Sequence, residues 1–401
     1  MSKGRVKKAN DSGGIGSELV TLVRTNIREY AMYIALVLIF IFFGIKTNGI
    51  FLSPRNISDL INQTGYVAVI AIGMTIILII KHIDLSVGFV AGFLGAIAAI
   101  LMRDGWSPWL TIPVVLLIGI AIGLYQGFLV AKVGVPAFVV TLAGMFIFRG
   151  LLSLVTGGTG TIIIKNERFK DISNGFIPDP FKGDIHILTL AIGIIAVGLL
   201  IFSQIKSRIN LRKYNFKVIS SPIFIAKIVF ISAIIMCIVW VLASYYGIPW
   251  TAVIVLVVLL IYNFMLNKTR LGRYIYGVGG NAEAAELSGI NVEKITLFAF
   301  ASVSMLAALG GILYTSRVAS ATPAAGVGFE LDAIASSYIG GVSVSGGVGR
   351  VTNTIIGAFV IMSLTNGLNL MGIDISAQYI VKGTIFILAV AFDVKTRGRK
   401  N

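Results

Sequence analysis

Two aspartates that open small-residue segments are the residues of this chain best suited to bind a polar ligand. Asp84 begins "DLSVGFVAG" and Asp332 begins "DAIASSYIGG", and each is followed eight residues later by a glycine. Aspartate is a favourable helix N-cap, because its carboxylate accepts unpaired N–H groups and offsets the positive end of the helix. The pattern predicts two short helices with polar ends that enter from opposite faces, although two unrelated helix caps would give the same pattern.

Patterns that support catalysis or ion coupling are missing from the sequence. There is no GxxxxGK[ST] phosphate-binding loop, and "GVGGN" at 277–281 lacks the strand and helix context of a dinucleotide loop. His82 and His186 are far apart, and no His, Cys and Glu residues have metal-ligand spacing. Carboxylates within apolar segments are few, which disfavours a proton- or sodium-coupled carrier. We therefore expect no enzyme activity and no bound metal or cofactor on this chain.

The composition places these residues in a membrane protein. Of 401 residues, 57% are hydrophobic and 12% are charged, whereas a soluble domain carries about 25% charged residues. The net charge of +16 could suggest a nucleic-acid partner. The basic residues, however, lie between apolar segments rather than on one soluble domain, so we expect no nucleic acid. Cys237 is the single cysteine, which excludes a disulfide within the chain.

Eleven apolar runs and one more polar segment define the expected fold. The segment 327–346 is too polar and glycine-rich for a lipid-facing helix, and it suits a discontinuous helix that lines a protein cavity. The sequence predicts an all-α polytopic membrane protein with about twelve transmembrane segments. The apolar runs lie at 31–45, 64–80, 84–102, 109–131, 135–155, 185–204, 228–247, 249–267, 295–316, 352–370 and 376–393.

The distribution of Lys and Arg predicts the orientation of these spans. If the N-terminus is inside and all twelve segments cross, most basic residues fall on the cytoplasmic side. Both termini and the polar stretch 279–294 are then cytoplasmic. Within the spans, we expect Lys382 to extend toward an interface. The pairs Gly88/Gly92 and Gly119/Gly123 have the spacing of close helix packing in lipid, although glycine is also simply frequent in membrane helices.

The polar stretch "GGNAEAAELSGINVEK" interrupts the apolar pattern and carries the clearest resemblance. Within "RLGRYIYGVGGNAEAAELSGINVEKI" it resembles the cytoplasmic coupling region of ABC importer permeases for monosaccharides, the ribose/xylose/multiple-sugar permease family. The similarity covers about 50–205 and 268–395, and "GGTGTI" and "GFIPD" favour the xylose and multiple-monosaccharide branch. Further motifs match in the same order: "GMTIILIIKHIDLSVGFVAG", "VGVPAFVVTLAGMFIFRG", "PAAGVGFELDAIASSYIGGVSVSGGVGRVTNTIIGA" and "NGLNLMGI".

The resemblance implies the partners of this chain. It implies a subunit of the bacterial cytoplasmic membrane that moves a monosaccharide, such as xylose or several aldoses. Family members work with a second permease subunit, with cytoplasmic ATPase subunits that bind ATP and Mg²⁺, and with an extracytoplasmic sugar-binding protein. We expect a permease homodimer and a tandem-domain ATPase.

The resemblance also assigns functional residues. The Ala-Glu segment becomes the helix that docks on the ATPase, where Asn281 caps its start, Gly289 ends it, and Ala284 and Ala285 touch the ATPase groove. The expected coupling residues are Gly280, Asn281, Ala282, Ala284, Ala285, Leu287, Ser288 and Gly289. The polar residues expected near the substrate pathway, as partners for sugar hydroxyls, are Asn62, Gln63, Asp84, Ser86, Asp332 and Ser336.

One segment departs from the ten-span members of the family. The segment 206–267 adds a basic loop and two apolar runs, which we expect to form a peripheral hairpin outside a ten-span core. The expected divisions are a tail at 1–29, the first half of the core at 30–205, the insertion at 206–267, the coupling region at 268–294, the second half at 295–394 and a tail at 395–401.

Other functions stay open at this point. Permeases for nucleosides or branched-chain amino acids share the broad fold, and the sequence does not identify the cargo. An ion-coupled secondary carrier is the alternative of a different class, and it would transport without ATPase partners. A structural membrane subunit without a transport path is a further alternative.

Overall fold

The computed structural model describes residues 27–157, 160–181, 183–214, 216 and 218–397. Most of the predicted N-terminal tail and residues 398–401 of the C-terminal tail lie outside the described residues. The elements in chain order are α2 (Ile27–Lys46), η1 (Ile50–Leu52), α3 (Pro54–Ile79), α4 (Val87–Arg103), α5 (Pro108–Ala131), α6 (Ala137–Thr156), β1 (Ile162–Ile163), α7 (Glu167–Asn174), α8 (Ile187–Lys213), α9 (Ser221–Ala243), α10 (Trp250–Lys268), α11 (Arg270–Gly280), α12 (Ala282–Leu287), α13 (Val292–Val318), β2 (Ser320–Ala321), α14 (Phe329–Ile339), α15 (Val351–Leu370) and α16 (Ile375–Arg397).

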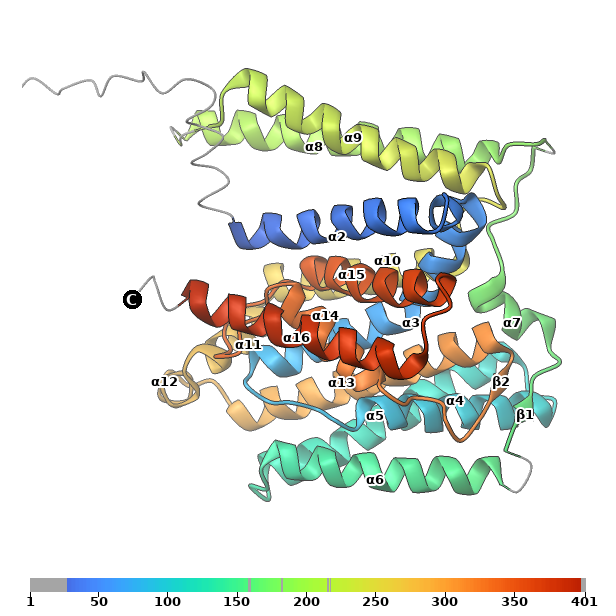
Figure 1. Cartoon of the computed structure of the whole chain (residues 1–401). Coiled ribbons are helices and arrows are strands. Elements are labelled where there is room, and N and C mark those ends of the chain that lie inside the picture. Colours follow the sequence, from blue (N-terminus) through green and yellow to red (C-terminus); the bar gives the residue numbers. More distant parts are fainter. Residues whose placement is uncertain (1–26, 158–159, 182, 215, 217, 398–401) are drawn as a thin grey trace, which may run out of the picture.

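The long helices run roughly parallel to one another, as Figure 1 shows. Among the described residues, eight helices are long and apolar enough to cross a membrane, and three shorter apolar helices lie within α2, α4 and α16. These positions agree with the eleven predicted apolar runs. The fold is therefore a mostly helical, polytopic membrane fold, and the number of spans stays a prediction.

Local signals at the helix ends explain where several helices begin. Ser53 accepts a hydrogen bond from the backbone N–H of Asn56, and Pro54 occupies the first position of α3. Proline suits that position because its missing N–H would have no partner inside the helix. Asn291 caps α13 in the same way, since its side chain accepts from the N–H of Lys294 at 2.8 Å. These caps determine where the two longest core helices, α3 and α13, begin.

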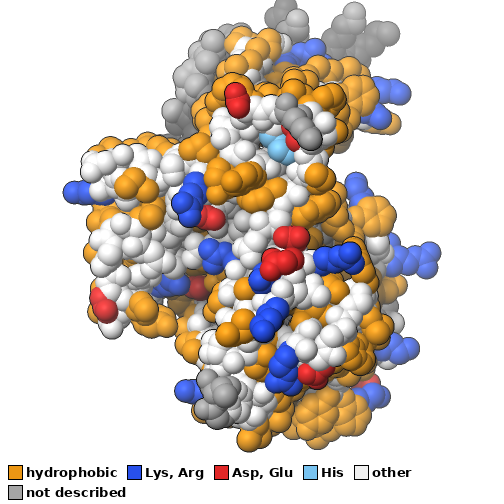
Figure 2. Space-filling model, turned by 90° about the vertical axis from the view of Figure 1, so that its right-hand side faces the viewer, with side chains coloured by type: hydrophobic (Ala, Val, Ile, Leu, Met, Phe, Trp, Pro, Cys, Tyr) orange, Lys and Arg blue, Asp and Glu red, His pale blue; other side chains and the backbone are white. Residues whose placement is uncertain are grey.

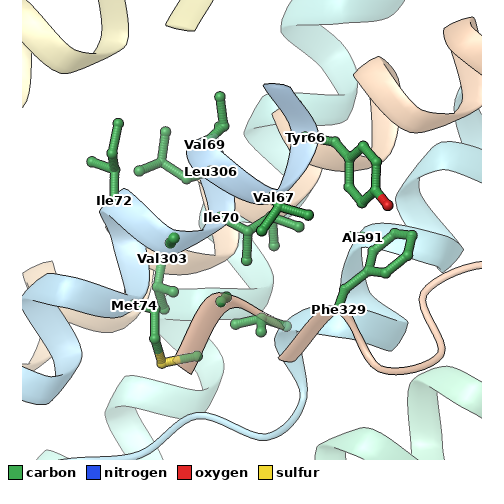
Figure 3. Packing of buried hydrophobic residues seen from close by; sticks show 14 of the residues in the cluster. Tyr66, Val67, Val69, Ile70, Ile72, Met74, Ala91, Val303, Leu306 and Phe329 are labelled. Carbon is green, nitrogen blue, oxygen red and sulfur yellow. The ribbon is translucent and has the colours of Figure 1, made fainter. Parts of the chain in front are cut away.

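The centre of the protein is built on α3 and α13. In the most apolar window of α3, 89% of the residues are buried within the protein, and 72% are buried in that of α13. Figure 3 shows side chains of both helices, Val67, Ile70, Val303 and Leu306 among them, packed together. The other helices of the core therefore pack around α3 and α13.

Glycines let the backbones of neighbouring helices approach closely at this centre. A β-carbon at Gly123 of α5 would overlap the carbonyl oxygen of Phe300 on α13, and one at Gly119 would lie 2.8 Å from that of Ser304. A β-carbon at Gly92 of α4 would overlap the carbonyl of Ala325. The predicted small-residue packing is thus confirmed at Gly119, Gly123 and Gly92.

The helices next to the basic loop are arranged differently from the prediction. The loop follows α8, and α8 and α9 form a hairpin at the edge of the molecule (top of Figure 1), with only 11% and 6% of their most apolar windows buried. In contrast, α10 packs against α3, α11 and α15, and Tyr262 Oη lies 2.7 Å from Ser302 Oγ on α13. The prediction that 206–267 forms a peripheral pair is therefore wrong for α10. Both α9 and α10 are strongly apolar, so hydropathy alone does not predict that α10 packs against the core.

One end of the bundle is closed by short elements. The strands β1 and β2 pair antiparallel, and α7 is fixed to α13 because Ser316 Oγ donates to the carbonyl of Phe169 at 2.7 Å while Ser173 Oγ donates to that of Leu313 at 2.8 Å. Figure 2, which faces this end, shows Lys, Arg, Asp and Glu side chains scattered among apolar ones. The beginning of α2, the helix α12 and the end of α16 lie together at the opposite end (Figure 1).

Candidate functional site

Two short helices begin beside each other in the interior, at the place predicted from the two aspartates. The helix α4 starts at Val87 and α14 starts at Phe329, and both residues are buried. Their entry segments cross so closely that a β-carbon at Gly326 would overlap the carbonyl oxygen of Gly88. We call the crossing of 86–88 with 326–330 the junction.

Asp84 lies two residues before Ser86, the N-cap of α4, and binds that residue instead of capping the helix directly as predicted. One carboxylate oxygen of Asp84 accepts hydrogen bonds from the backbone N–H of Ser86 at 2.8 Å and from its hydroxyl at 2.7 Å. The amide of Gln126 on α5 donates to the same hydroxyl at 2.9 Å. Both predicted residues are fully buried. They therefore form one polar network with Gln126, which the sequence did not single out.

Asp332 has a different function from the predicted cap. The helix α14 begins three residues earlier, after Gly328, whose φ of 80° suits glycine. The carboxylate of Asp332 instead pairs with Lys382 of α16, with Nζ–Oδ1 and Nζ–Oδ2 distances of 3.0 and 3.2 Å. The expectation that Lys382 extends toward an interface is therefore wrong. A buried charge without a partner is strongly destabilising, which explains why Lys382 pairs with Asp332. Because the two residues are 50 positions apart in the sequence, local patterns did not indicate this pair.

Glu330 is a second buried carboxylate at the junction, and the sequence did not assign it to the site. Its side chain is 8% exposed, and Oε2 has no hydrogen-bond partner among the described residues. A β-carbon at Gly88 would overlap this same oxygen, so the carboxylate lies directly on the first turn of α4. Its position in the first turn of α14 could have indicated it, since carboxylates are favourable at helix N-termini.

The remaining predicted pathway residues fall into separate surroundings. Asn366 of α15 exchanges hydrogen bonds with Asn56 at 3.0 and 3.1 Å and donates to Gln63 at 3.5 Å. Asn62 is buried, and its Oδ1 has no partner in the described part of the chain. The hydroxyl of Ser336 donates to the carbonyl of Asp332 within its own helix. The structure thus places the six residues in three local groups rather than in one cluster.

Aromatic rings adjoin the start of α14. The ring of Tyr66 lies 4.7 Å from that of Phe329 and 5.3 Å from that of Tyr314, between centroids. Figure 3 shows Tyr66 and Phe329 side by side. Aromatic faces next to carboxylates and amides suit a neutral ligand that has both C–H faces and hydroxyl groups. Within the ranges that the structure describes, no group of three or more His, Cys, Asp or Glu residues could hold a metal ion.

The polar stretch at 279–294 forms a short helix, α12, at the end of the bundle opposite to α7. Asn281 caps it as predicted, because its side chain accepts from the N–H of Ala284 at 3.1 Å, and Gly289 follows the helix with φ of 81°. Leu287 is 90% exposed, whereas Ala285 is 6% exposed. Ala285 faces the protein and cannot contact a partner with its side chain, which corrects that prediction. Leu287 presents the apolar surface instead.

Helix α12 is joined to the inner helices through α11. The hydroxyl of Tyr276 donates to the carbonyl of Gly349 at 2.7 Å, and Lys81 Nζ donates to that of Gly280 at 3.1 Å. Burial raises the pKa of Tyr276, so its hydroxyl stays a neutral donor near pH 7. The N–H of Gly347 donates to the carbonyl of Ile79 at 2.8 Å. The end of α3 and the segment between α14 and α15 therefore meet directly beside the helix that leads into α12.

Comparisons with known proteins cover nearly the whole chain. Residues 56–390 match the family described as branched-chain amino acid transport system / permease component. The xylose transport system permease protein of Escherichia coli K12 is 38% identical over 398 residues, which cover 98% of each chain. That of Haemophilus influenzae is 38% identical over 94% of this chain and 98% of its own. The ribose import permease protein of Escherichia coli K12 is 34% identical over 86% and 87%, respectively. No solved structure matched.

Proposed function

This chain belongs to the family of membrane permease components of ABC importers, and from that premise we propose that its cargo is a pentose of the xylose type. Similarity to xylose permeases over 98% of both chains supports this cargo. The chain is the permease component of a monosaccharide importer in a bacterial inner membrane. In this proposal ATP and Mg²⁺ bind to a separate ATPase, and the chain itself has no catalytic site.

The observation that best supports ATP-driven coupling is the connection between α12 and the junction helices. An exposed apolar side chain, Leu287, stands on a short capped helix. The helix before it bonds to the segment that follows α14 through Tyr276 and Gly349. A push on α12 would thus reach the end of a helix whose beginning lies at the junction. We infer that α12 docks on the ATPase and that α4 and α14 border the sugar path.

The partners and the orientation complete the proposal. The ATPase has two nucleotide-binding domains in one chain, a second copy of this permease completes the membrane part, and an extracytoplasmic binding protein delivers the sugar. The α12 end of the bundle is cytoplasmic, together with both termini. The excess of Lys and Arg assigned to that side in the sequence supports this orientation.

A branched-chain amino acid is the second candidate cargo, because the matching family is described by that cargo. An amino acid carries a carboxylate and an ammonium group, and such a ligand would need charged partners of both signs. Lys382, a cation near the junction, is already paired with Asp332, and the Arg149 guanidinium lies over the ring of Phe89, 5.6 Å from its centroid. The engagement of both cations favours the neutral sugar.

The proposal is tested with proteoliposomes that contain the permease, its ATPase and its binding protein. We expect uptake of radiolabelled xylose only with ATP inside the vesicles, and no uptake of leucine. Leu287→Arg should abolish co-purification of the ATPase, whereas Glu283→Gln, an exposed change on the same helix, should not. Sustained accumulation by the permease alone under a proton or sodium gradient would instead identify a secondary carrier.

A further inference from the structure

The junction contains a buried carboxylate whose position is not explained by helix capping alone. Glu330 is 8% exposed, and its Oε2 has no hydrogen-bond partner among the described residues. A buried polar group without a partner is costly, more so when it can carry a charge. Such a group is retained where a ligand or a moving element supplies the partner.

The charges around Glu330 define the class of ligand. Two helix N-termini meet here, and on their own they would favour an anion. Carboxylates already lie at both N-termini. Asp84 lies at the start of α4, and Glu330 and Asp332 lie in the first turn of α14. Asp332 is held by Lys382, whereas Asp84 and Glu330 form no ion pair in the described structure, and one carboxylate oxygen of each has no hydrogen-bond partner. Of these two acids, Glu330 is the one whose unpartnered oxygen lies against Gly88 at the crossing. An anionic ligand is therefore disfavoured, and a sugar hydroxyl can supply the hydrogen-bond donor that Oε2 lacks.

The backbone crossing explains how this oxygen becomes accessible. Gly88 and Gly326 have no side chains, and the backbones of the two entry segments meet beside the Glu330 carboxylate. A separation of α4 from α14 would open space at this point, because neither Gly88 nor Gly326 has a side chain that could fill it. Oε2 would then face the opening.

We propose that Glu330 accepts a hydrogen bond from one sugar hydroxyl as the substrate passes the junction, and that it is a specificity-determining residue of the translocation path. The inference rests on the proposed function, since it requires that a monosaccharide crosses here. It assigns to the permease a direct selection of the cargo, in addition to any selection by the binding protein.

The test compares two substrates in two permeases. Uptake of xylose and of its single-deoxy analogues is measured in the full reconstituted complex, with the binding protein saturated by each sugar. Because the binding protein is the same in every assay, a change in the ratio of rates belongs to the permease. For one deoxy analogue, the wild type should prefer xylose by about tenfold or more, as expected for a hydrogen bond to a charged acceptor. Glu330→Gln should reduce this preference toward equal rates for the two sugars.

Two controls keep the result specific. Glu167→Gln changes an exposed acid of α7 and should keep the wild-type ratio. ATPase assembly must be retained in Glu330→Gln; if it is not, Glu330→Asp, which shortens the side chain but keeps the charge, should shift the ratio in the same direction. Equal slowing of all sugars, or an unchanged ratio, would overturn the inference. A wild-type complex that moves leucine and no monosaccharide would overturn the proposed function, and this inference with it.

Discussion

The two most different regions of this protein are the central helices α3 and α13 and the outer hairpin α8–α9. In their most apolar windows, 89% of the residues of α3 are buried within the protein, against 6% of those of α9. Yet α9 is the more apolar helix. In a membrane the surface must match lipid, while the interior can hold polar and small residues that pack or bind. The helices with the weaker hydropathy signal, α3 and α13, therefore form the centre of the protein rather than its lipid-facing surface.

The glycines show the same difference. In the core, the missing β-carbons at Gly311, Gly123 and Gly326 make room for the backbone of a neighbouring segment. In the hairpin, Gly193 faces only the side chain of Val239, and Gly198 has no neighbouring atom within 4 Å. Backbone contacts cannot relax as side chains can, so we expect the core to tolerate far less change.

The largest expected effect is at Gly311. A β-carbon there would overlap the carbonyl of Ala91 on α4, so Gly311→Val should cost more than about 3 kcal/mol and prevent recovery of a monodisperse permease. The matched change in the hairpin, Gly198→Val, should stay within about 0.5 kcal/mol. Size-exclusion chromatography and thermal unfolding in detergent measure both. Equal tolerance at the two positions would contradict the distinction between core and hairpin.

The next effect concerns the ion pair between α14 and α16. Lys382→Met leaves the Asp332 carboxylate without its partner and should cost about 3–5 kcal/mol. The double variant Asp332→Asn/Lys382→Met removes both charges and should recover most of that loss. In the hairpin, Arg208 donates to the neutral oxygens of Ile219 and Ser221, so Arg208→Gln should cost about 1 kcal/mol. Failure of the double variant to recover stability would show that the pair is not the cause.

A smaller effect than those in the core is expected at the contact between α8 and α9 inside the hairpin. Gly193→Ala brings a methyl group against Val239, a side chain that can shift, and should cost about 1 kcal/mol. Uptake by the assembled complex should be unchanged, because the hairpin lies outside the proposed path. Parallel unfolding and uptake assays separate the two outcomes, and a loss of uptake at normal stability would place α8 in the transport mechanism.

The sequence predicted the elements better than their contacts. Apolar runs located the spans, and Asn281 and Gly289 marked the ends of α12, because capping depends on local residue type. The start of α14 was missed by three residues, since Gly328 and not Asp332 precedes its first turn. Nothing local indicated that Lys382 would reach Asp332. The same limit applies to α9 and α10, which are both strongly apolar but pack against different elements.

The central claim is that the junction helices border the sugar path and that the hairpin does not. The single cysteine of the chain, Cys237, is exposed on α9 and offers a natural comparison. Leu331, which is 57% exposed on α14 beside Glu330 and Asp332, provides the second position through Leu331→Cys in a Cys237→Ala background.

The most direct measurement is ATP-driven xylose uptake before and after treatment with N-ethylmaleimide, using partner subunits without cysteine and confirming modification by mass spectrometry. Before treatment both proteins should transport at similar rates. Modification at position 331 should block uptake, because it burdens the first turn of α14, directly after the junction, while modification of Cys237 in the wild type should leave uptake unchanged. Block of uptake through Cys237, or full uptake with position 331 modified, would contradict the account.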